Sequence, residues 1–152
     1  MDPDEVAEGV DVVYLPDDEY SGELRVRARY AGFEGVGQAW VDRRRLSKFA
    51  KALKQYPLHE DSPVAFSAGL GDVQDYIEFI GLTVAPVGEK GQVVVTARLA
   101  AEEWRGGKPV STNQVVVECP TSYEYLRRFS DHLHLILNGK IDQARLDFDQ
   151  LL

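Results

Sequence analysis

The chain has one cysteine, Cys119, and no hydrophobic run long enough to cross a bilayer. A single cysteine cannot form an internal disulfide, and a membrane-spanning helix needs roughly 20 apolar residues. No charged-then-apolar secretory segment opens the sequence. These absences disfavour a disulfide-stapled secreted scaffold and a helical membrane protein, and they predict a cytoplasmic protein. With 152 residues, 44% of them hydrophobic, the chain is expected to bury one globular core.

Basic residues are missing from residues 1–23, which carry nine acids. Residues 24–56 carry nine bases and two acids, whereas residues 57–152 carry eight bases and fourteen acids. The formal net charge of −8 disfavours general nucleic-acid binding, although a local basic surface can still bind an acidic partner. We expect residues 1–23 to be an acidic, partly flexible extension that shields the basic block, and residues 24–152 to be one domain.

No catalytic, metal or cofactor motif follows from residue spacing. His132 and His134 lie two apart on an expected helix and point to different faces, which disfavours chelation of a metal. The glycines within residues 32–37 precede no helix, so they are typical of a turn rather than of a phosphate loop. Cys119 has no neighbouring signature of a nucleophile, and a lone cysteine is usually a buried thiol. The sequence predicts no enzyme activity, no metal and no cofactor.

The middle of the first half predicts a β-hairpin that leads into an amphipathic helix. Apolar residues alternate with arginines over residues 24–30, residues 31–35 can turn, and residues 36–41 return as a second strand. Asp42 is the expected N-cap of the helix, and Pro57 is expected to end it. The apolar stripe of this helix consists of Leu46, Phe49, Ala50 and Leu53.

The second half predicts more strands and a second helix. Strands are expected at residues 64–68, 76–85, 92–100 and 112–119. The apolar phase of the second of these changes near Gly81, which predicts a β-bulge there. Thr121 and Glu124 fit a capping box, and Asn138–Gly139 fits a helix end. No internal repeat is seen.

These elements predict an α+β fold with one curved antiparallel sheet of about six strands, in the order ββαββββα. Short connections favour antiparallel neighbours, because parallel pairing needs a long crossover. Both helices are expected to pack on a single face of this sheet. The loop at residues 101–109 is expected to be polar and irregular.

The candidate interaction residues are basic or aromatic and fall into three groups. They are Arg25, Arg27 and Arg29 on the first strand, Arg43, Arg44, Lys48 and Lys51 on the first helix, and Trp104 and Arg105 in the loop. The strand and helix groups would lie on opposite sides of two layers of roughly 10 Å each, beyond the ~8 Å screening length. A solvated face is favoured over nucleic-acid binding, because no recognition motif accompanies the charge.

Several segments resemble the bacterial WapI-type immunity proteins, small cytosolic companions of wall-associated toxins. The matching segments are residues 35–42 (GVGQAWVD), Leu46, Phe49, Ala50, Leu53, Pro57, residues 84–91 and residues 121–124 (TSYE). The similarity spans most of residues 24–146 and lies at turns, caps and core positions. It implies a non-enzymatic protein that binds another, toxin-like protein, and it implies no roles for individual residues.

An alternative function stays open from the residues themselves. A small-ligand-binding protein or an enzyme could use a cleft between the sheet and the helices. This alternative predicts convergent polar side chains in that cleft, whereas a protein-binding module predicts none. The sequence leaves the oligomeric state and the identity of any partner open.

Overall fold

The computed structural model describes residues 7–88 and 90–149, which form an α+β fold with antiparallel strands. In the first half the elements are β1 (Gly9–Pro16), β2 (Ser21–Tyr30), β3 (Phe33–Asp42), α1 (Arg43–Ala52) and β4 (Val64–Leu70). In the second half they are β5 (Ile77–Val87), β6 (Gln92–Ala100), β7 (Glu103–Arg105), β8 (Lys108–Val110), β9 (Gln114–Ser122), α2 (Tyr123–Leu137) and β10 (Ala144–Leu146). The predicted fold class is therefore confirmed.

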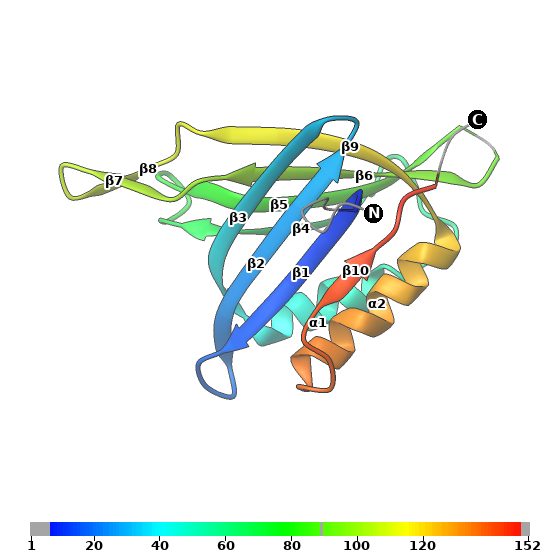
Figure 1. Cartoon of the computed structure of the whole chain (residues 1–152), viewed down its shortest axis with the longest axis horizontal. Coiled ribbons are helices and arrows are strands. Elements are labelled where there is room, and N and C mark those ends of the chain that lie inside the picture. Colours follow the sequence, from blue (N-terminus) through cyan, green and yellow to red (C-terminus); the bar gives the residue numbers. More distant parts are fainter. Residues whose placement is uncertain (1–6, 89, 150–152) are drawn as a thin grey trace.

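The strands form two four-stranded sheets and a separate hairpin, so the prediction of a single curved sheet of about six strands is wrong (Figure 1). The first sheet has the order β10-β1-β2-β3, and the second has the order β4-β5-β6-β9. The expected irregular loop at residues 101–109 contains the two short strands β7 and β8, with Trp104 opposite Pro109. The predicted hairpins β2–β3 and β5–β6 are present in their expected order.

The sheets pack face to face where β3 crosses the second sheet. The inward side chains of β3 are very small, and a Cβ built on Gly37 would lie 2.5 Å from the carbonyl oxygen of Phe79. A Cβ on Gly35 would overlap the side chain of Val115. Since real side chains do not tolerate such distances, these glycines let one backbone cross closely over the other sheet. This close crossing is the reason why β3 packs on the second sheet instead of joining its edge.

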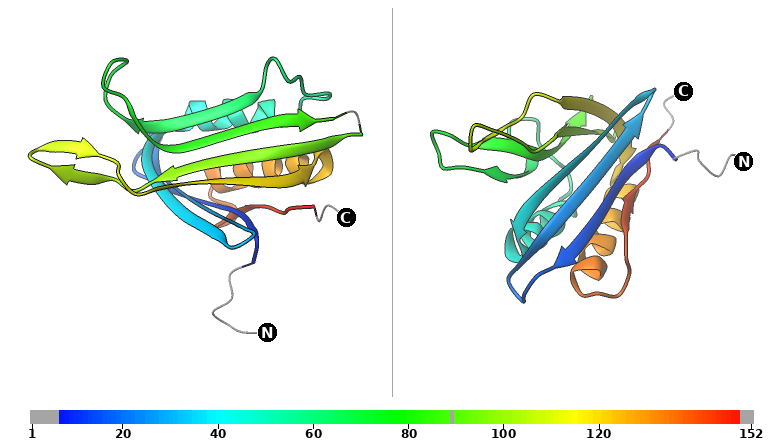
Figure 2. Two further views of the ribbon diagram at one scale, coloured as in Figure 1. Left: turned by 90° about the horizontal axis from the view of Figure 1, so that it is seen from above. Right: turned by 60° about the vertical axis from the view of Figure 1, so that its left-hand side comes forward.

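Both helices lie in the angle between the sheets (Figure 2). Helix α1 contacts β3 and β4, whereas α2 contacts β1, β9 and β10, so each helix packs on strands from both sheets. The expectation that both helices cover a single face of one sheet is therefore wrong. The helices also contact each other, since Ser130 Oγ donates to the carbonyl oxygen of Ala50 at 2.5 Å and Lys54 pairs with Asp131 at 2.6 Å.

The helix caps agree only in part with the sequence. Asp42 caps α1 as predicted, and the hydrogen bond from the backbone amide of Arg44, at 2.7 Å, holds the pKa of Asp42 below its usual range. Helix α1 ends at Ala52, so Pro57 does not terminate it. Ser122, not Thr121, caps α2. The hydroxyl of Thr121 is buried and instead donates to the carbonyl oxygen of Asp147 at 2.9 Å.

Strand β1 occupies the interior of the first sheet, between β10 and β2. It pairs with β2 along its whole length, and its inward side chains Val10, Val12 and Tyr14 are buried. The expected extension at residues 1–23 therefore contributes a strand to the core, and the domain does not begin at residue 24. Of the first nine residues, which are expected to be loose, residues 1–6 lie outside the described residues, whereas Gly9 begins β1.

The predicted bulge is present, but Phe79 is the extra residue. Ala68 of β4 lies opposite Ile80, and the next residue, Gly69, lies opposite Glu78, so Phe79 has no partner in β4. This irregularity turns both Phe79 and Ile80 toward the core, which explains the change of apolar phase in the sequence. Gly81 follows with regular pairing.

The two halves of the chain follow one plan of three strands, a helix and a fourth strand. In the first half this is β1-β2-β3-α1-β4, and in the second it is β5-β6-β9-α2-β10. Each fourth strand pairs with the first strand of the other half, β4 with β5 and β10 with β1. The two halves are therefore equivalent in topology and exchange their fourth strands, an arrangement that we call the duplication, although the sequence showed no repeat.

Equivalent residues of the two halves support the duplication. The N-caps Asp42 and Ser122 lie 80 positions apart, as do the buried helix residues. The buried pairs are Leu46 and Leu126, Phe49 and Phe129, Ala50 and Ser130, and Leu53 and Leu133. The halves differ most at one connection, because β2 and β3 are joined by the two-residue turn Ala31–Gly32, whereas the β7–β8 hairpin is inserted between β6 and β9.

Candidate interaction surface

The outer face of the first sheet carries no described helix or strand (Figure 1). Alternation along β2 turns Leu24, Val26 and Ala28 into the core and the intervening arginines outward. We call the outward side chains of β1, β2 and β3 the open face. It comprises Asp11, Val13, Leu15, Glu23, Arg25, Arg27, Val36, Gln38 and Trp40.

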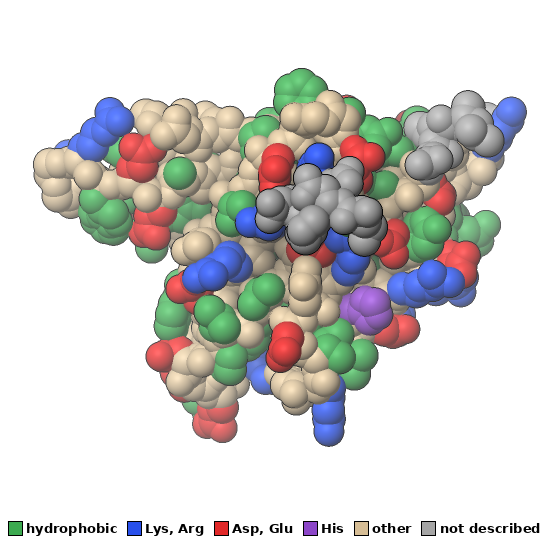
Figure 3. Space-filling view, viewed as in Figure 1, with side chains coloured by type: hydrophobic (Ala, Val, Ile, Leu, Met, Phe, Trp, Pro, Cys, Tyr) green, Lys and Arg blue, Asp and Glu red, His purple; other side chains and the backbone are tan. Residues whose placement is uncertain are grey.

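Strand register places each charged residue that β2 contributes to the open face next to at least one apolar residue of β1 or β3. In one cross-strand row, Glu23 lies between Leu15 of β1 and Trp40 of β3, which are 47% and 53% exposed. Arg25 lies between Val13 and Gln38 in the next row. Hydrophobic, basic and acidic side chains are accordingly mixed over this face (Figure 3). A shallow hollow of about 250 Å³ opens among Val13, Val36 and the stems of the two arginines.

Ion pairs fix the charged side chains of the open face. Arg25 pairs with Glu23 at 3.2 Å, and Arg27 lies 3.7 Å from Glu34. At the β10 side, Arg145 pairs with Asp11 at 2.8 Å. Burial alone would lower the pKa of Arg145, but the hydrogen bonds and charges of Asp11 and Asp147 raise it instead. The arginines thus hold defined positions beside the exposed apolar groups.

The outer face of the second sheet is different, because its polar groups satisfy one another. Glu78 accepts from Arg98 at 3.1 Å and from the hydroxyl of Ser67 at 2.6 Å, and Arg98 also donates to Thr83 at 3.2 Å. This network lies over Gly81, where a Cβ would meet the Arg98 guanidinium at 2.7 Å. The network thus links four polar side chains, Ser67, Glu78, Thr83 and Arg98, on the outer face of the second sheet.

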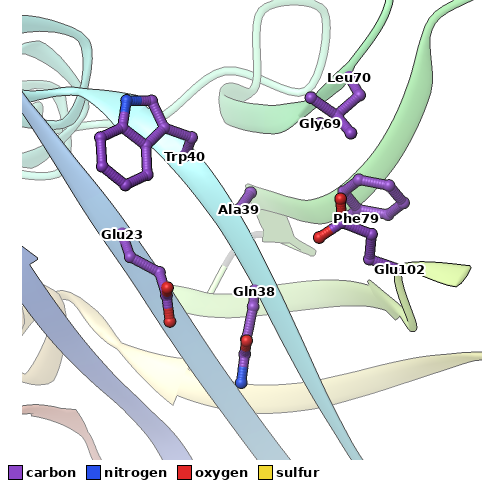
Figure 4. A pocket seen from close by; sticks show the side chains of 8 residues that line it. All are labelled: Glu23, Gln38, Ala39, Trp40, Gly69, Leu70, Phe79 and Glu102. Atoms are coloured by element: carbon purple, nitrogen blue, oxygen red, sulfur yellow. The ribbon is translucent and has the colours of Figure 1, made fainter. Parts of the chain in front are cut away.

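A pocket of about 210 Å³ opens at the edge of β3, beside the open face (Figure 4). Strand β3 supplies Gln38, Ala39 and Trp40, and Glu23 enters from β2. The far side is formed by Gly69, Leu70, Phe79 and Glu102. The pocket therefore combines an exposed indole with two carboxylates, and we call it the edge pocket.

The predicted basic residues of α1 lie apart from the open face. Arg43 donates to the side chain of Asn138 at 2.8 Å, and Arg44 lies 3.6 Å from Asp42. Lys48 and Lys51 are exposed and have no ion-pair partner within the described part of the chain. Lys48 lines a groove of about 450 Å³ between α1 and β4.

The remaining predicted residues lie on two further elements. Trp104 and Arg105 project with the β7–β8 hairpin, where the Trp104 indole donates to Glu102 at 3.3 Å and Arg105 pairs with Glu103 at 3.4 Å. Arg29 is half-buried near the end of β2, opposite Glu34. The nine predicted residues thus form three separate groups.

The structure adds site residues that the sequence reading missed. The most exposed of them are Leu15, Val36 and Trp40, and the acidic ones are Glu23 and Glu102. The alternation of residues 36–41 was available as a signal for the outward direction of Val36 and Trp40. The cross-strand rows were not, because they depend on β1, which was assigned to an extension.

Cys119 is buried on the inner face of β9. Burial, with smaller contributions from the carboxylates of Glu8 and Glu118, raises the pKa of the Cys119 thiol to about 12. Since the thiolate is the reactive form, we expect no rapid reaction with a disulfide reagent such as Ellman's reagent at pH 8 in the native protein. In denaturant the thiol should react at once, and fast stoichiometric labelling of the native chain would contradict this prediction.

The described residues contain neither a candidate metal cluster nor a helix that could span a membrane. Among residues 7–88 and 90–149, no group of three or more His, Cys, Asp and Glu side chains is placed to hold a metal ion. In the same residues, no helix has both the length and the apolar character required to span a membrane.

Comparison of the chain with protein-family models, with curated proteins and with solved structures finds no match. The resemblance to WapI-type immunity proteins therefore stays a prediction.

Proposed function

We propose that the protein is a non-enzymatic binding module that uses the open face to bind another protein, as an immunity protein binds and neutralises its toxin. The observation that carries this proposal is the row structure of the face. Exposed apolar side chains of β1 and β3 flank Glu23 of β2, and Arg25 and Arg27 each have one apolar cross-strand neighbour, Val13 and Val36.

The composition of the face suits protein recognition. Tryptophan and arginine are the residues most enriched among interface hot spots, and apolar contacts around them exclude water. Trp40 and Val36 remain 53% and 40% exposed. Arg25 and Arg27 keep about half of their side chains exposed, so both can still meet an acidic partner.

The decisive measurement is complex formation with a toxin-like partner, which the proposal expects to be encoded by a neighbouring gene. The purified proteins should form a complex, and Arg27→Glu should weaken it by about tenfold or more, since it reverses a charge in the centre of the open face. Titration calorimetry or biosensor binding would give both dissociation constants. A matching neutralisation assay should show the same loss.

Lys51→Glu is the matched control, because it makes the same charge change on an exposed position of α1, outside the open face. It should leave the dissociation constant within about twofold of the unmodified protein. The proposal fails if the two proteins form no complex. It also fails if Lys51→Glu disrupts the complex while Arg27→Glu does not.

A second candidate function has one observation in its favour. The groove between α1 and β4 is large enough for a metabolite, and Arg45 and Lys48 line it with Gln55. Arg45 is already engaged, because it donates to the carbonyl oxygen of Ser67 at 2.6 Å. A small anionic ligand would therefore depend on Lys48, and its binding should be lost in Lys48→Ala and retained in Arg27→Glu.

A further inference from the structure

The edge pocket lies where the two halves of the duplicated fold differ. Trp40 and Pro120 are equivalent, since each lies two residues before the N-cap of the following helix. At Pro120 the chain closes on itself, because the amide of Asp149 donates to the Pro120 carbonyl oxygen at 3.0 Å. Residues 147–149 follow β10 and thereby cover β9 at this point.

The equivalent segment of the first half takes another path. Ala68 of β4 lies opposite Ile80 of β5, and Leu146 of β10 lies opposite Val10 of β1. Since β5 and β1 are the first strands of their halves, Ala68 and Leu146 occupy equivalent positions. After Ala68 the chain stays paired with β5, with Gly69 opposite Glu78 and Leu70 opposite Ile77. Leu70 therefore lines the edge pocket instead of closing over Trp40. Among the described strands, β3 pairs only with β2, so its other edge is open here.

The chemistry of the pocket selects a cation. Glu23 and Glu102 line the pocket from opposite sides of β3, Glu23 on the side of Trp40 and Glu102 beside Phe79 (Figure 4). Each carboxylate accepts one hydrogen bond: Glu23 accepts from Arg25 at 3.2 Å, and Glu102 accepts from the Trp104 indole at 3.3 Å. Within residues 7–88 and 90–149 the second oxygen of each accepts no hydrogen bond. An indole face and carboxylates together attract ammonium and guanidinium groups.

The size of the pocket selects a side chain. Its volume of about 210 Å³ lies below the roughly 300–1,000 Å³ of sites that hold whole small molecules. Edge strands bind extended peptides by main-chain hydrogen bonds, while pockets along the edge select alternate side chains. The edge pocket lies beside β3, where a side chain of a peptide paired with β3 would point.

We propose that an extended segment of a partner protein pairs with the open edge of β3 and places one lysine or arginine side chain in the edge pocket. The inference rests on the proposed function and adds the chemistry of the partner to it. The closed contact between Asp149 and Pro120 in the other half shows the backbone contact that an added segment would make at Trp40.

The test uses two capped hexapeptides that differ at one position. Acetylated and amidated Thr-Val-Lys-Val-Thr-Val is compared with the same peptide carrying norleucine, an uncharged chain of similar length, in place of lysine. Each is titrated into the full chain labelled with nitrogen-15. The lysine peptide should shift the amide signals of residues 36–42 and the Trp40 indole signal, and it should bind about tenfold more tightly than the norleucine peptide.

Glu23→Gln combined with Glu102→Gln should abolish the preference for lysine while the spectrum stays that of a folded protein. Glu118→Gln is the matched control, because Glu118 is an exposed carboxylate on β9 at the position equivalent to Gln38. It should retain the full preference. Equal binding of both peptides, shifts confined to other elements, or no binding at millimolar concentration would overturn the inference. The neighbouring-gene complex tests the proposed function separately, since Arg27 does not line the edge pocket.

Discussion

Leu133→Ala is expected to lower the free energy of unfolding by about 2–5 kcal/mol. Leu133 is 1% exposed on α2, and α2 lies in the angle between the two sheets and contacts α1. Truncation leaves a cavity, because the surrounding strands belong to two sheets that β3 already holds in close contact. Denaturant unfolding followed by circular dichroism measures the change.

Leu135→Ala provides the control on the same helix, since Leu135 is 38% exposed. Its effect should stay within about 0.5 kcal/mol. The duplication adds a second expectation, because Leu53 is the equivalent residue on α1 and is also 1% exposed. Leu53→Ala should therefore fall in the same range as Leu133→Ala. A loss below 1 kcal/mol for Leu133→Ala would refute the packing of α2 between the sheets.

Local pattern was sufficient to predict most of the elements. The alternation over residues 24–30 and the stripe from Leu46 to Leu53 became β2 and α1, because each pattern has one buried face. The arrangement of the strands was not predictable in this way. It depends on the crossing of β3 over the second sheet at Gly37. A glycine in a strand indicates that another segment packs closely there, but the sequence does not show which segment it is.

The duplication escaped the sequence reading for two physical reasons. Ser130 occupies the position of Ala50, and a polar residue interrupts the apolar stripe although its hydroxyl is satisfied by the Ala50 carbonyl oxygen. The β7–β8 insertion also changes the spacing, so that the first strands of the halves are not 80 residues apart as the helices are. When equivalent elements are not separated by a constant number of residues, the strand register is needed to detect the repeat.

The candidate site was predicted in part. Arg25 and Arg27 do lie on the face opposite the helices, as strand alternation requires. Their apolar neighbours come from β1 and β3, and the acids of the edge pocket come from β2 and from the start of the inserted hairpin. Such convergence depends on tertiary contacts between distant segments. Residue spacing in one strand carries no information about it.

The acidic N-terminal region is expected to shield part of the basic surface, and this stays a prediction. Asp11 pairs with Arg145 beside β10, and Glu8 accepts from the backbone amide of Ala31 at 2.6 Å. These contacts join the described part of this region to the first sheet, so it contributes to the folded core as well.

Val12→Asp is expected to prevent folding, or to lower the free energy of unfolding by at least about 3 kcal/mol at pH 7. Val12 is 1% exposed and points from β1 into the core. A carboxylate there would be buried without a partner, and an uncompensated buried charge costs about 3–5 kcal/mol. Thermal unfolding of the variant and of the unmodified protein measures the difference. If residues 9–16 were a loose extension, the substitution would have almost no effect.

Val13→Asp separates the effect of burial from that of strand propensity. Val13 lies on the open face opposite Arg25, so the same substitution leaves the new carboxylate in water beside a guanidinium. Its effect should remain below about 1 kcal/mol. Acid provides a second test, because burial raises the pKa of the carboxyl introduced by Val12→Asp above its unfolded value. The deficit of Val12→Asp relative to the unmodified protein should therefore shrink as the pH falls from 7 toward 4.5, and a deficit that does not change with pH would contradict the buried position of residue 12.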